Sequence, residues 1–259
     1  MDETRTRVDV GRVIFRQDGW VVQTLRSHVE NVARLAEAWD NSRAFRGLLP
    51  DLERTRQQVI EAARIHDMAK PAHFHLEYKQ DHYREWKWEY SFRGHRFNAF
   101  HSDAYIQMLA QLHHIYSVTD ITQHMARLKL GKATEAIAEN LPLDLYTLEM
   151  CDQIEATFAR AALGSDDPEE RVFMDFQFRS RAEAEYELDP FAFRQPPPVE
   201  FTAEYVELAP PQEKRLAAES AQDDTKRRAA LREMEKWLIE TLQTTPLQHK
   251  GVRLWPWTK

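Results

Sequence analysis

Residues 62–70, AARIHDMAK, decide how we interpret this chain, because they place two metal-binding side chains next to each other at the end of an apolar helical run. Hydrophobic periodicity predicts a helix over residues 51–68, and Pro71 marks its end. The adjacent pair His66-Asp67 offers an imidazole nitrogen and a carboxylate oxygen, which suit divalent cations such as Mn, Fe, Ni, Co, Zn or Mg. A carboxylate can also bridge two ions, so this pair predicts a metal centre.

Further residues that bind metals recur near the ends of predicted helices. They are His28, His95, the pair His113-His114, and Asp152. Asp152 lies in the apolar run 148–154, where a buried carboxylate needs a partner such as a metal ion. Lys70, three residues after Asp67, can neutralise a phosphate oxygen or pair with that carboxylate. If these side chains converge, the site holds one or two divalent cations and supports metal-assisted hydrolysis of phosphate esters.

Each of these residues also has a structural explanation when it is taken alone. His113-His114 can lie on the surface, and Asp152 can pair with an arginine. The other histidines show no partner pattern, and we expect them on the surface or in loops: His73, His75, His82, His124 and His249. The recurrence of the candidate ligands at helix ends favours the metal site.

Composition bounds the class of protein. Seven glycines in 259 residues disfavour glycine-rich nucleotide-binding folds and favour helices. The formal charge of −7 gives no global attraction to nucleic acid, so such a ligand would need a local basic patch. The one cysteine, Cys151, excludes an internal disulfide and a thiolate zinc cluster, and we expect it to be a core thiol. No apolar run has membrane length and residues 1–10 are mostly charged or polar, so we expect a cytoplasmic protein that contacts no membrane.

The residue pattern predicts a mainly α fold with an N-terminal β-hairpin. Residues 12–25 carry two β-rich runs around Asp18-Gly19, which predicts a two-residue turn with positive φ at both positions. A helix is expected to begin near Ser27 as its N-cap, and residues 72–94 are predicted to be an irregular loop. Further helices are expected at residues 95–111, 118–129, 132–140 and 143–163.

The character of the chain changes after residue 170, where the pattern predicts a small C-terminal β/α appendage. Period-two alternation predicts three short strands at residues 171–179, 184–194 and 199–208. A charged amphipathic helix is expected at about residues 213–243, and the apolar tail 254–257 is expected to dock. We therefore expect two parts, residues 1–170 and the appendage 171–259.

Together these motifs resemble the HD superfamily of metal-dependent phosphohydrolases, and within it the HD nuclease of type I CRISPR interference. The segments that carry the resemblance are SHVENVA at 27–33, ARIHDMAK at 63–70, RGHRFNA at 93–99, LHHIYS at 112–117 and CD at 151–152. They are similar to the family's first histidine helix, His-Asp-x-x-Lys motif, third-histidine segment, paired histidines and closing aspartate. The resemblance covers about residues 20–165 and implies an HD-domain helical bundle within residues 1–170. It also implies catalytic roles for Asp67 and Lys70 and a set of metal ligands: His28, His66, Asp67, His95, His113, His114 and Asp152.

Two features depart from the family pattern. Members commonly carry glycine after the paired histidines, where Ile115 stands here. The interval from His95 to His113 is short, which makes His101 an alternative third histidine. We prefer His95, because His101 leaves too few residues for a helix and a turn before His113.

The resemblance implies hydrolysis of single-stranded DNA phosphodiesters in antiviral defence, as an endonuclease or exonuclease that uses Mn, Ni, Co, Fe or Mg. Because we find no helicase segment and no Walker-type glycine loop, the expected form is a separate subunit that works with a CRISPR helicase and an RNA-guided surveillance complex. Basic and aromatic residues between the second and third motifs would either bind DNA by charge and stacking or pack on the core. These residues are Lys79, Tyr83, Arg84, Trp86, Lys87, Trp88, Tyr90, Arg93 and Arg96.

Two other functions compete with this one. The first is a small-molecule HD phosphohydrolase, such as a nucleotidase or cyclic-nucleotide phosphodiesterase, which shares the metal ligands but needs a closed pocket. The second is a degenerate HD scaffold that binds a partner protein through residues 171–259. The complete ligand set argues against a degenerate site.

Overall fold

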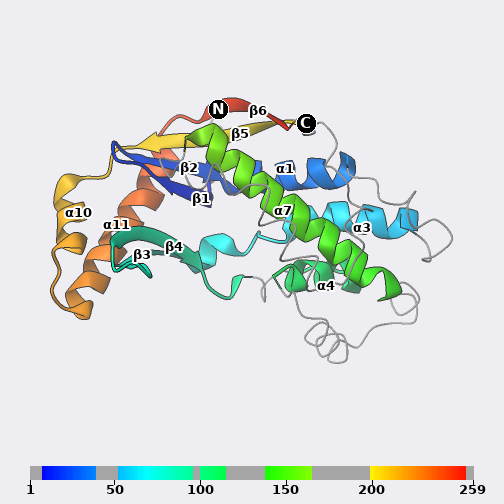
Figure 1. Cartoon of the computed structure of the whole chain (residues 1–259), viewed down its shortest axis with the longest axis horizontal. Coiled ribbons are helices and arrows are strands. Elements are labelled where there is room, and N and C mark those ends of the chain that lie inside the picture. The colour runs from blue at the N-terminus through cyan, green and yellow to red at the C-terminus, as the bar shows by residue number, and fades with distance from the viewer. Residues whose placement is uncertain (1–7, 39–51, 96–99, 115–137, 165–198, 255–259) are drawn as a thin grey trace, which may run out of the picture.

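The structure is a computed structural model that describes residues 8–38, 52–95, 100–114, 138–164 and 199–254. These residues form helices packed beside two antiparallel sheets, which confirms the prediction of a mainly α fold (Figure 1). The predicted helix at 118–129, the first six residues of the predicted helix 132–140, the strands at 171–179 and 184–194, Arg96, His124 and the tail beyond residue 254 lie outside the described residues. The end of the helix predicted at 132–140 is a short 3-10 helix, Ala138–Asn140.

Four helices form the larger hydrophobic core. They are α1 (Leu25–Ala38), α3 (Leu52–Ile65), α4 (Ala104–Leu112) and α7 (Leu141–Leu163). Their apolar faces meet in one cluster that contains the fully buried Val32, Leu35, Met108, Leu109 and Leu148. Cys151 lies in this core, where burial raises the pKa of its thiol, so the prediction of a core thiol is confirmed.

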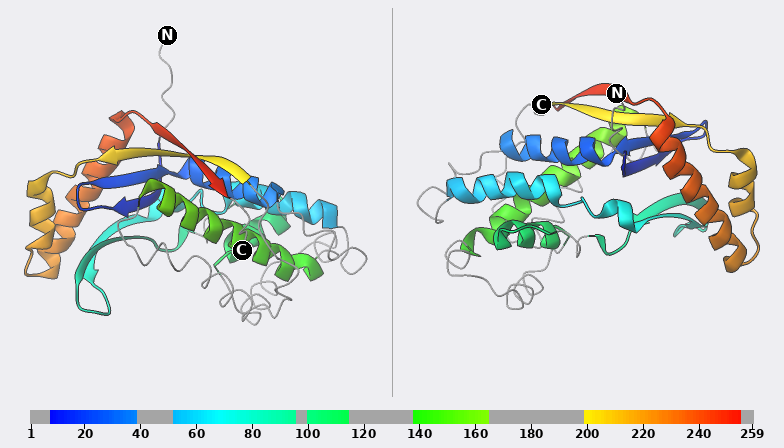
Figure 2. Two further views of the ribbon diagram at one scale, coloured as in Figure 1. Left: turned by 45° about the horizontal axis from the view of Figure 1, so that its top comes forward. Right: turned by 180° about the vertical axis from the view of Figure 1, so that it is seen from behind.

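A four-stranded sheet joins the two ends of the chain. Its order is β1 (Val10–Phe15), β2 (Trp20–Thr24), β5 (Val199–Leu208) and β6 (Gln248–Leu254), and all neighbours are antiparallel. Strand β5, predicted at 199–208, therefore pairs directly with the N-terminal hairpin. Figure 2 shows the yellow and red strands beside the blue hairpin in both views.

Side chains of this sheet alternate between two cores. Val21 contributes to the helical core, whereas its neighbours Trp20 and Val22 contribute to a second core on the other side. Helix α11 (Asp224–Thr244) and the hairpin of β3 (Phe74–Gln80) and β4 (Trp86–Phe92) cover that second core. The sheet thus forms a layer between the helical bundle and these C-terminal elements.

Residues 72–94 were predicted to be an irregular loop, and that prediction is wrong. After the short 3-10 helix Lys70–His73, β3 and β4 form a regular hairpin in full register from Phe74↔Phe92 to Gln80↔Trp86. Its aromatic side chains pack against the first hairpin, since the ring of Trp88 lies 5.2 Å from that of Trp20. Alternating aromatic and charged residues are a strand pattern, and the prediction gave the charges too much weight.

The turn of the N-terminal hairpin also differs from the prediction. The loop spans residues 16–19 between the pair Phe15↔Trp20, and the Arg16 N–H donates to the Gly19 carbonyl at 2.8 Å. Among the described residues, positive φ is confined to Arg84, Gly94 and Gly164, so Asp18-Gly19 is not a turn of the predicted type. Gly19 is instead needed for close approach, because a Cβ there would lie 2.9 Å from the Leu208 carbonyl oxygen.

Three helix boundaries also differ. Helix α1 begins at Leu25, and Thr24 rather than Ser27 caps it by accepting the Ser27 N–H at Oγ1. In place of a helix at 95–111, α4 begins at Ala104 after the N-cap Asp103. The predicted helix 213–243 is two helices, α10 (Gln212–Glu219) and α11, because Asp223 caps a new start by accepting the Lys226 N–H.

None of the helices in the described ranges has the length and apolar character that crossing a membrane requires.

Candidate metal centre

The structure brings all seven predicted ligands into one cluster between the helices, in which five are buried and His114 and Asp152 are partly buried. His28 comes from α1, His66 and Asp67 follow α3, His95 follows β4, His113 and His114 follow α4, and Asp152 comes from α7. Their ligand atoms form overlapping groups in which every atom lies within 4.8 Å of the others. One group is His28, His66, Asp67 and Asp152, and the next is Asp67, His95, His113 and His114.

Asp67 belongs to both groups and faces each with a different oxygen. Its Oδ2 lies 3.0 Å from His28 Nε2 and 3.2 Å from His66 Nε2. Its Oδ1 lies 2.9 Å from His95 Nε2 and 3.6 Å from His113 Nε2. Asp67 could therefore contact a cation held in either group.

Three of the histidines are oriented by the backbone in the same way. The Nδ1 atoms of His66, His95 and His113 bond the carbonyl oxygen three residues earlier, at Ala63, Phe92 and Ala110. Ala63 and Ala110 lie in the last turns of α3 and α4, where helix carbonyls lack donors from their own helix. Because a carbonyl oxygen accepts only from a protonated nitrogen, Nδ1 carries a proton in each of these rings, and Nε2 points toward the centre.

The inward-facing atoms fit cations. Within the described residues, four buried atoms of the centre make no hydrogen bond: His66 Nε2, His95 Nε2, His113 Nε2 and Asp67 Oδ1. These atoms contact one another only as histidine–aspartate ion pairs, so a cation bound in either group could serve as their partner. Imidazole nitrogens with carboxylate oxygens are donors for borderline divalent cations.

The first group carries positive charge on its histidines when no cation balances the acids. Burial acts to lower the pKa of His66, but the adjacent Asp67 and Asp152 raise it to about 9. Burial likewise opposes protonation of His28, and Glu155 with the two aspartates raises its pKa to about 10. A cation that binds here therefore displaces protons.

Asp67 itself stays ionised, because charges beside it outweigh its burial. Burial acts to raise the pKa of Asp67, whereas His66 and Lys70 hold it well below its usual range. The Lys70 ammonium contacts Asp67 Oδ2 and lies 5.0 Å from the centre of the Phe92 ring. Of the two roles predicted for Lys70, the structure therefore shows the pairing with the carboxylate.

Two histidines of the second group, His113 and His114, differ from those of the first group, because their pKa values are lowered rather than raised. Burial lowers the pKa of His113, and burial together with the neighbouring His113 lowers the pKa of His114 to about 2. Neutral imidazoles are the form that binds metal ions. The two groups thus differ in how strongly protons compete with a cation.

The alternative third histidine lies outside the cluster. His101 Nε2 contacts Glu61 Oε1 at 3.1 Å, whereas His95 contacts Asp67. Of the histidines assigned to the surface, the structure exposes His75, His82 and His249, and it half-buries His73.

Sequence reasoning missed two acidic residues of the centre. Glu149 forms a third possible group with His114 and Asp152, and Glu155 bonds the outer nitrogen of His28. Both are buried on α7 at intervals of three residues from Asp152, on the same helix face. A buried carboxylate is costly without a partner, and this argument applies to Glu149 and Glu155 as it does to Asp152. The sequence therefore contained a signal that could have identified both glutamates.

The basic residues of the β3–β4 hairpin are neutralised by neighbouring acids. Lys79 pairs with Glu77 and Glu89, and Lys87 pairs with Asp81. Trp88 and Tyr90 pack on the second core, which supports the packing alternative for these two rings. Tyr83 and Trp86 remain 71% and 43% exposed.

Comparisons of this chain with protein-family models, curated proteins and solved structures found no match.

Proposed function

We propose that this chain is a metal-dependent hydrolase of phosphate esters with an HD-type centre. One observation carries the proposal, namely that the two oxygens of the buried Asp67 face two separate groups of histidines. The convergence of imidazole nitrogens and carboxylate oxygens within 4.8 Å of one another in each group supports it, because this is the donor set of a divalent cation.

Divalent cations at such a site supply Lewis acidity, which lowers the pKa of water and neutralises phosphate oxygens. The residues of this chain position the cations and the charged groups around them. Asp67 sets the spacing of the two groups, and the backbone carbonyls of Ala63, Phe92 and Ala110 fix the direction of three histidines. Lys70 holds Asp67 ionised and keeps a positive charge beside the place where a phosphate would lie.

For the substrate we propose single-stranded DNA, cut with the help of a separate CRISPR helicase and an RNA-guided surveillance complex. The motifs quoted above support this branch of the HD superfamily. The exposed ring of Tyr83, on the hairpin that leads to His95, can stack on a base, whereas Trp86 already stacks on Tyr78 and lies against the Arg227 guanidinium. Because the neighbouring lysines are paired with acids, stacking rather than charge would dominate at this hairpin.

A second candidate is a small-molecule phosphohydrolase, and the burial of the centre favours it. His28, His66, Asp67 and His113 are each no more than 1% exposed in the part of the chain that the structure describes. Side chains this enclosed suit a compact phosphate ester better than a long strand.

The test measures cleavage of circular single-stranded DNA and of mononucleotides in parallel with Mn²⁺. We expect His66→Ala and Asp67→Ala to abolish hydrolysis while circular dichroism shows a retained fold. The matched control is His101→Ala, which removes a histidine outside the cluster and should leave activity unchanged. Full activity of either cluster variant would refute the proposal, and activity on mononucleotides alone would select the second candidate.

A further inference from the structure

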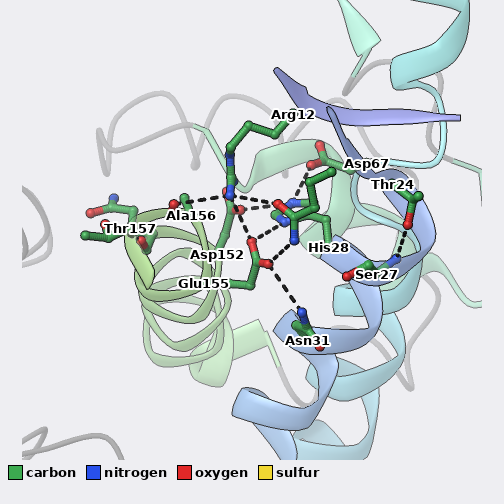
Figure 3. Close-up of polar contacts among 12 residues, drawn as sticks. Arg12, Thr24, Ser27, His28, Asn31, Asp67, Asp152, Glu155, Ala156 and Thr157 are labelled. Carbon is green, nitrogen blue, oxygen red and sulfur yellow. Dashed lines mark hydrogen bonds and ion pairs between the residues drawn. The ribbon is translucent and has the colours of Figure 1, made fainter. Parts of the chain in front are cut away.

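His28 differs from the other ligands in how its outer nitrogen is held. It is the fourth residue of α1, so the carbonyl three residues earlier is engaged by the helix itself. Its Nδ1 instead contacts Glu155 Oε2 from α7 at 2.5 Å (Figure 3). The acceptor at this one histidine is therefore a charged carboxylate, whereas the other three use neutral carbonyls.

Glu155 is fully buried and is held by donors from three other elements. Its Oε2 accepts from Arg12 Nη1 at 3.3 Å, and its Oε1 accepts from Gln23 Nε2 at 2.6 Å and from Asn31 Nδ2 at 3.5 Å. These donors come from β1, β2 and α1. The carboxylate has no freedom to turn away from His28.

Arg12 is itself fixed in place. Its Nη1 also donates to Gln23 Oε1 at 3.1 Å and to the Ala156 carbonyl at 3.2 Å, and the residue is 5% exposed. A buried arginine beside a buried glutamate balances its charge, which makes a full carboxylate stable next to a ligand histidine. Figure 3 shows Arg12, Glu155 and His28 joined by successive contacts, with Asp67 on the other side of the His28 ring.

We propose that Glu155 is the positioning residue for His28 and that Arg12 holds Glu155 in place. With this carboxylate as acceptor, His28 binds a cation more tightly than it would with a carbonyl acceptor. The inference rests on the proposed function, because it takes the first group as a cation site. A carboxylate that accepts the outer N–H of a ligand histidine fixes the ring and raises the basicity of its inner nitrogen. The N-terminal hairpin thereby takes part in metal binding without contributing a ligand.

Glu155→Gln tests the charge with little change in shape. The amide replaces one acceptor oxygen by a donor nitrogen, which must face either His28 or the donors Gln23 and Asn31. The matched control is Asp144→Asn on the same helix, compared at pH 8, where this buried carboxyl is also ionised; Asp144 bonds Tyr105 rather than any ligand. Mn²⁺ binding is measured by titration calorimetry on the full chain.

We expect Glu155→Gln to weaken the tighter Mn²⁺ site by about 10- to 100-fold, and Asp144→Asn to leave it unchanged. Unchanged affinity in Glu155→Gln, or an equal loss in both variants, overturns the inference while the proposed function stands. If the wild-type protein binds no Mn²⁺, the proposed metal centre itself fails.

A measurement on the wild-type protein keeps the inference testable even if Glu155→Gln does not fold. In the protein loaded with Zn²⁺, proton NMR resolves the Nδ1–H signals of the ligand histidines. We expect the His28 proton to resonate further downfield than those of His66, His95 and His113, because its acceptor is charged. A His28 signal within the range of the other three overturns the inference.

Discussion

Asp144 offers a test of the fold that does not depend on the metal centre. This carboxyl lies in α7, is 5% exposed, and accepts a hydrogen bond from the Tyr105 hydroxyl at 2.7 Å. Burial raises its pKa from 3.8 to about 7, although its hydrogen bonds oppose the rise. The folded protein therefore holds a proton here that the unfolded chain releases near pH 4.

The sign of the effect follows from linkage. Below pH 4 the carboxyl is protonated in both states, and its full contribution to stability is present. As the pH rises toward about 7, the unfolded chain has lost this proton and the folded protein still binds it, so the free energy of unfolding falls. At about 1.36 kcal/mol for each pH unit, the loss is on the order of 4 kcal/mol between the two values.

Asp144→Asn removes this titration and retains a group of similar shape that can accept the Tyr105 bond. We expect the variant and the wild type to have similar free energies of unfolding at pH 4. At pH 8 the variant should be the more stable, by up to the same ~4 kcal/mol. Urea unfolding at several pH values with a chelator present measures the difference, in which other titrating groups cancel.

The reasoning is refuted if the difference between variant and wild type does not change with pH, or if it grows as the pH falls. A second variant sharpens the test. Tyr105→Phe removes the hydrogen bond that opposes the rise, so the pKa of Asp144 should rise further and the pH-dependent loss should extend to higher pH.

Four further predictions concern the candidate metal centre and two glycines. Asp67→Ala should reduce the number of Mn²⁺ ions bound, because this residue belongs to both groups; titration calorimetry that shows unchanged stoichiometry would contradict its role in both groups. Mn²⁺ at a hundred times its dissociation constant should stabilise the wild type by about 2.7 kcal/mol, and a melting temperature that does not respond to EDTA would argue against the site. Gly19→Ala should cost about 1–3 kcal/mol in urea unfolding, since its Cβ would lie 2.9 Å from the Leu208 carbonyl oxygen, and an unaffected variant would show that β2 and β5 can separate. Gly164→Ala should cost about 1–2 kcal/mol, because Gly164 ends α7 with φ of 78°, and a neutral result would contradict that backbone conformation.

The sequence predicted which side chains converge at the candidate site better than it predicted their surroundings. A histidine or acid in an apolar run is expected to be buried on folding and then needs a polar or charged partner. This reasoning led to His28, His66 and Asp152. The same reasoning did not extend to Glu155, one helical turn after Asp152, because Asp152 alone was taken as the buried carboxylate of this helix. Arg12 could not be found, since its partner lies 143 residues away and only the folded sheet brings them together.

Local patterns predicted helices well and the strands less well. Helix α7 was expected at 143–163 and is observed at Leu141–Leu163, because a long apolar periodicity leaves few alternatives. The β3–β4 hairpin was missed because its burial comes from α11, which lies far along the chain and covers Phe74 and Leu76. The turn at Gly19 was misassigned for a similar reason. Its glycine is required by the close approach of the Leu208 carbonyl, which belongs to a strand far along the chain.

The place of β5 between β2 and β6 has a consequence for synthesis on the ribosome. All candidate ligands up to Asp152 emerge before β5, so a nascent chain carries its complete ligand set while the β2 edge still offers unpaired backbone groups. Such an edge templates association between chains. Chains that stop before residue 199 should therefore aggregate or require a chaperone, although they contain every predicted ligand.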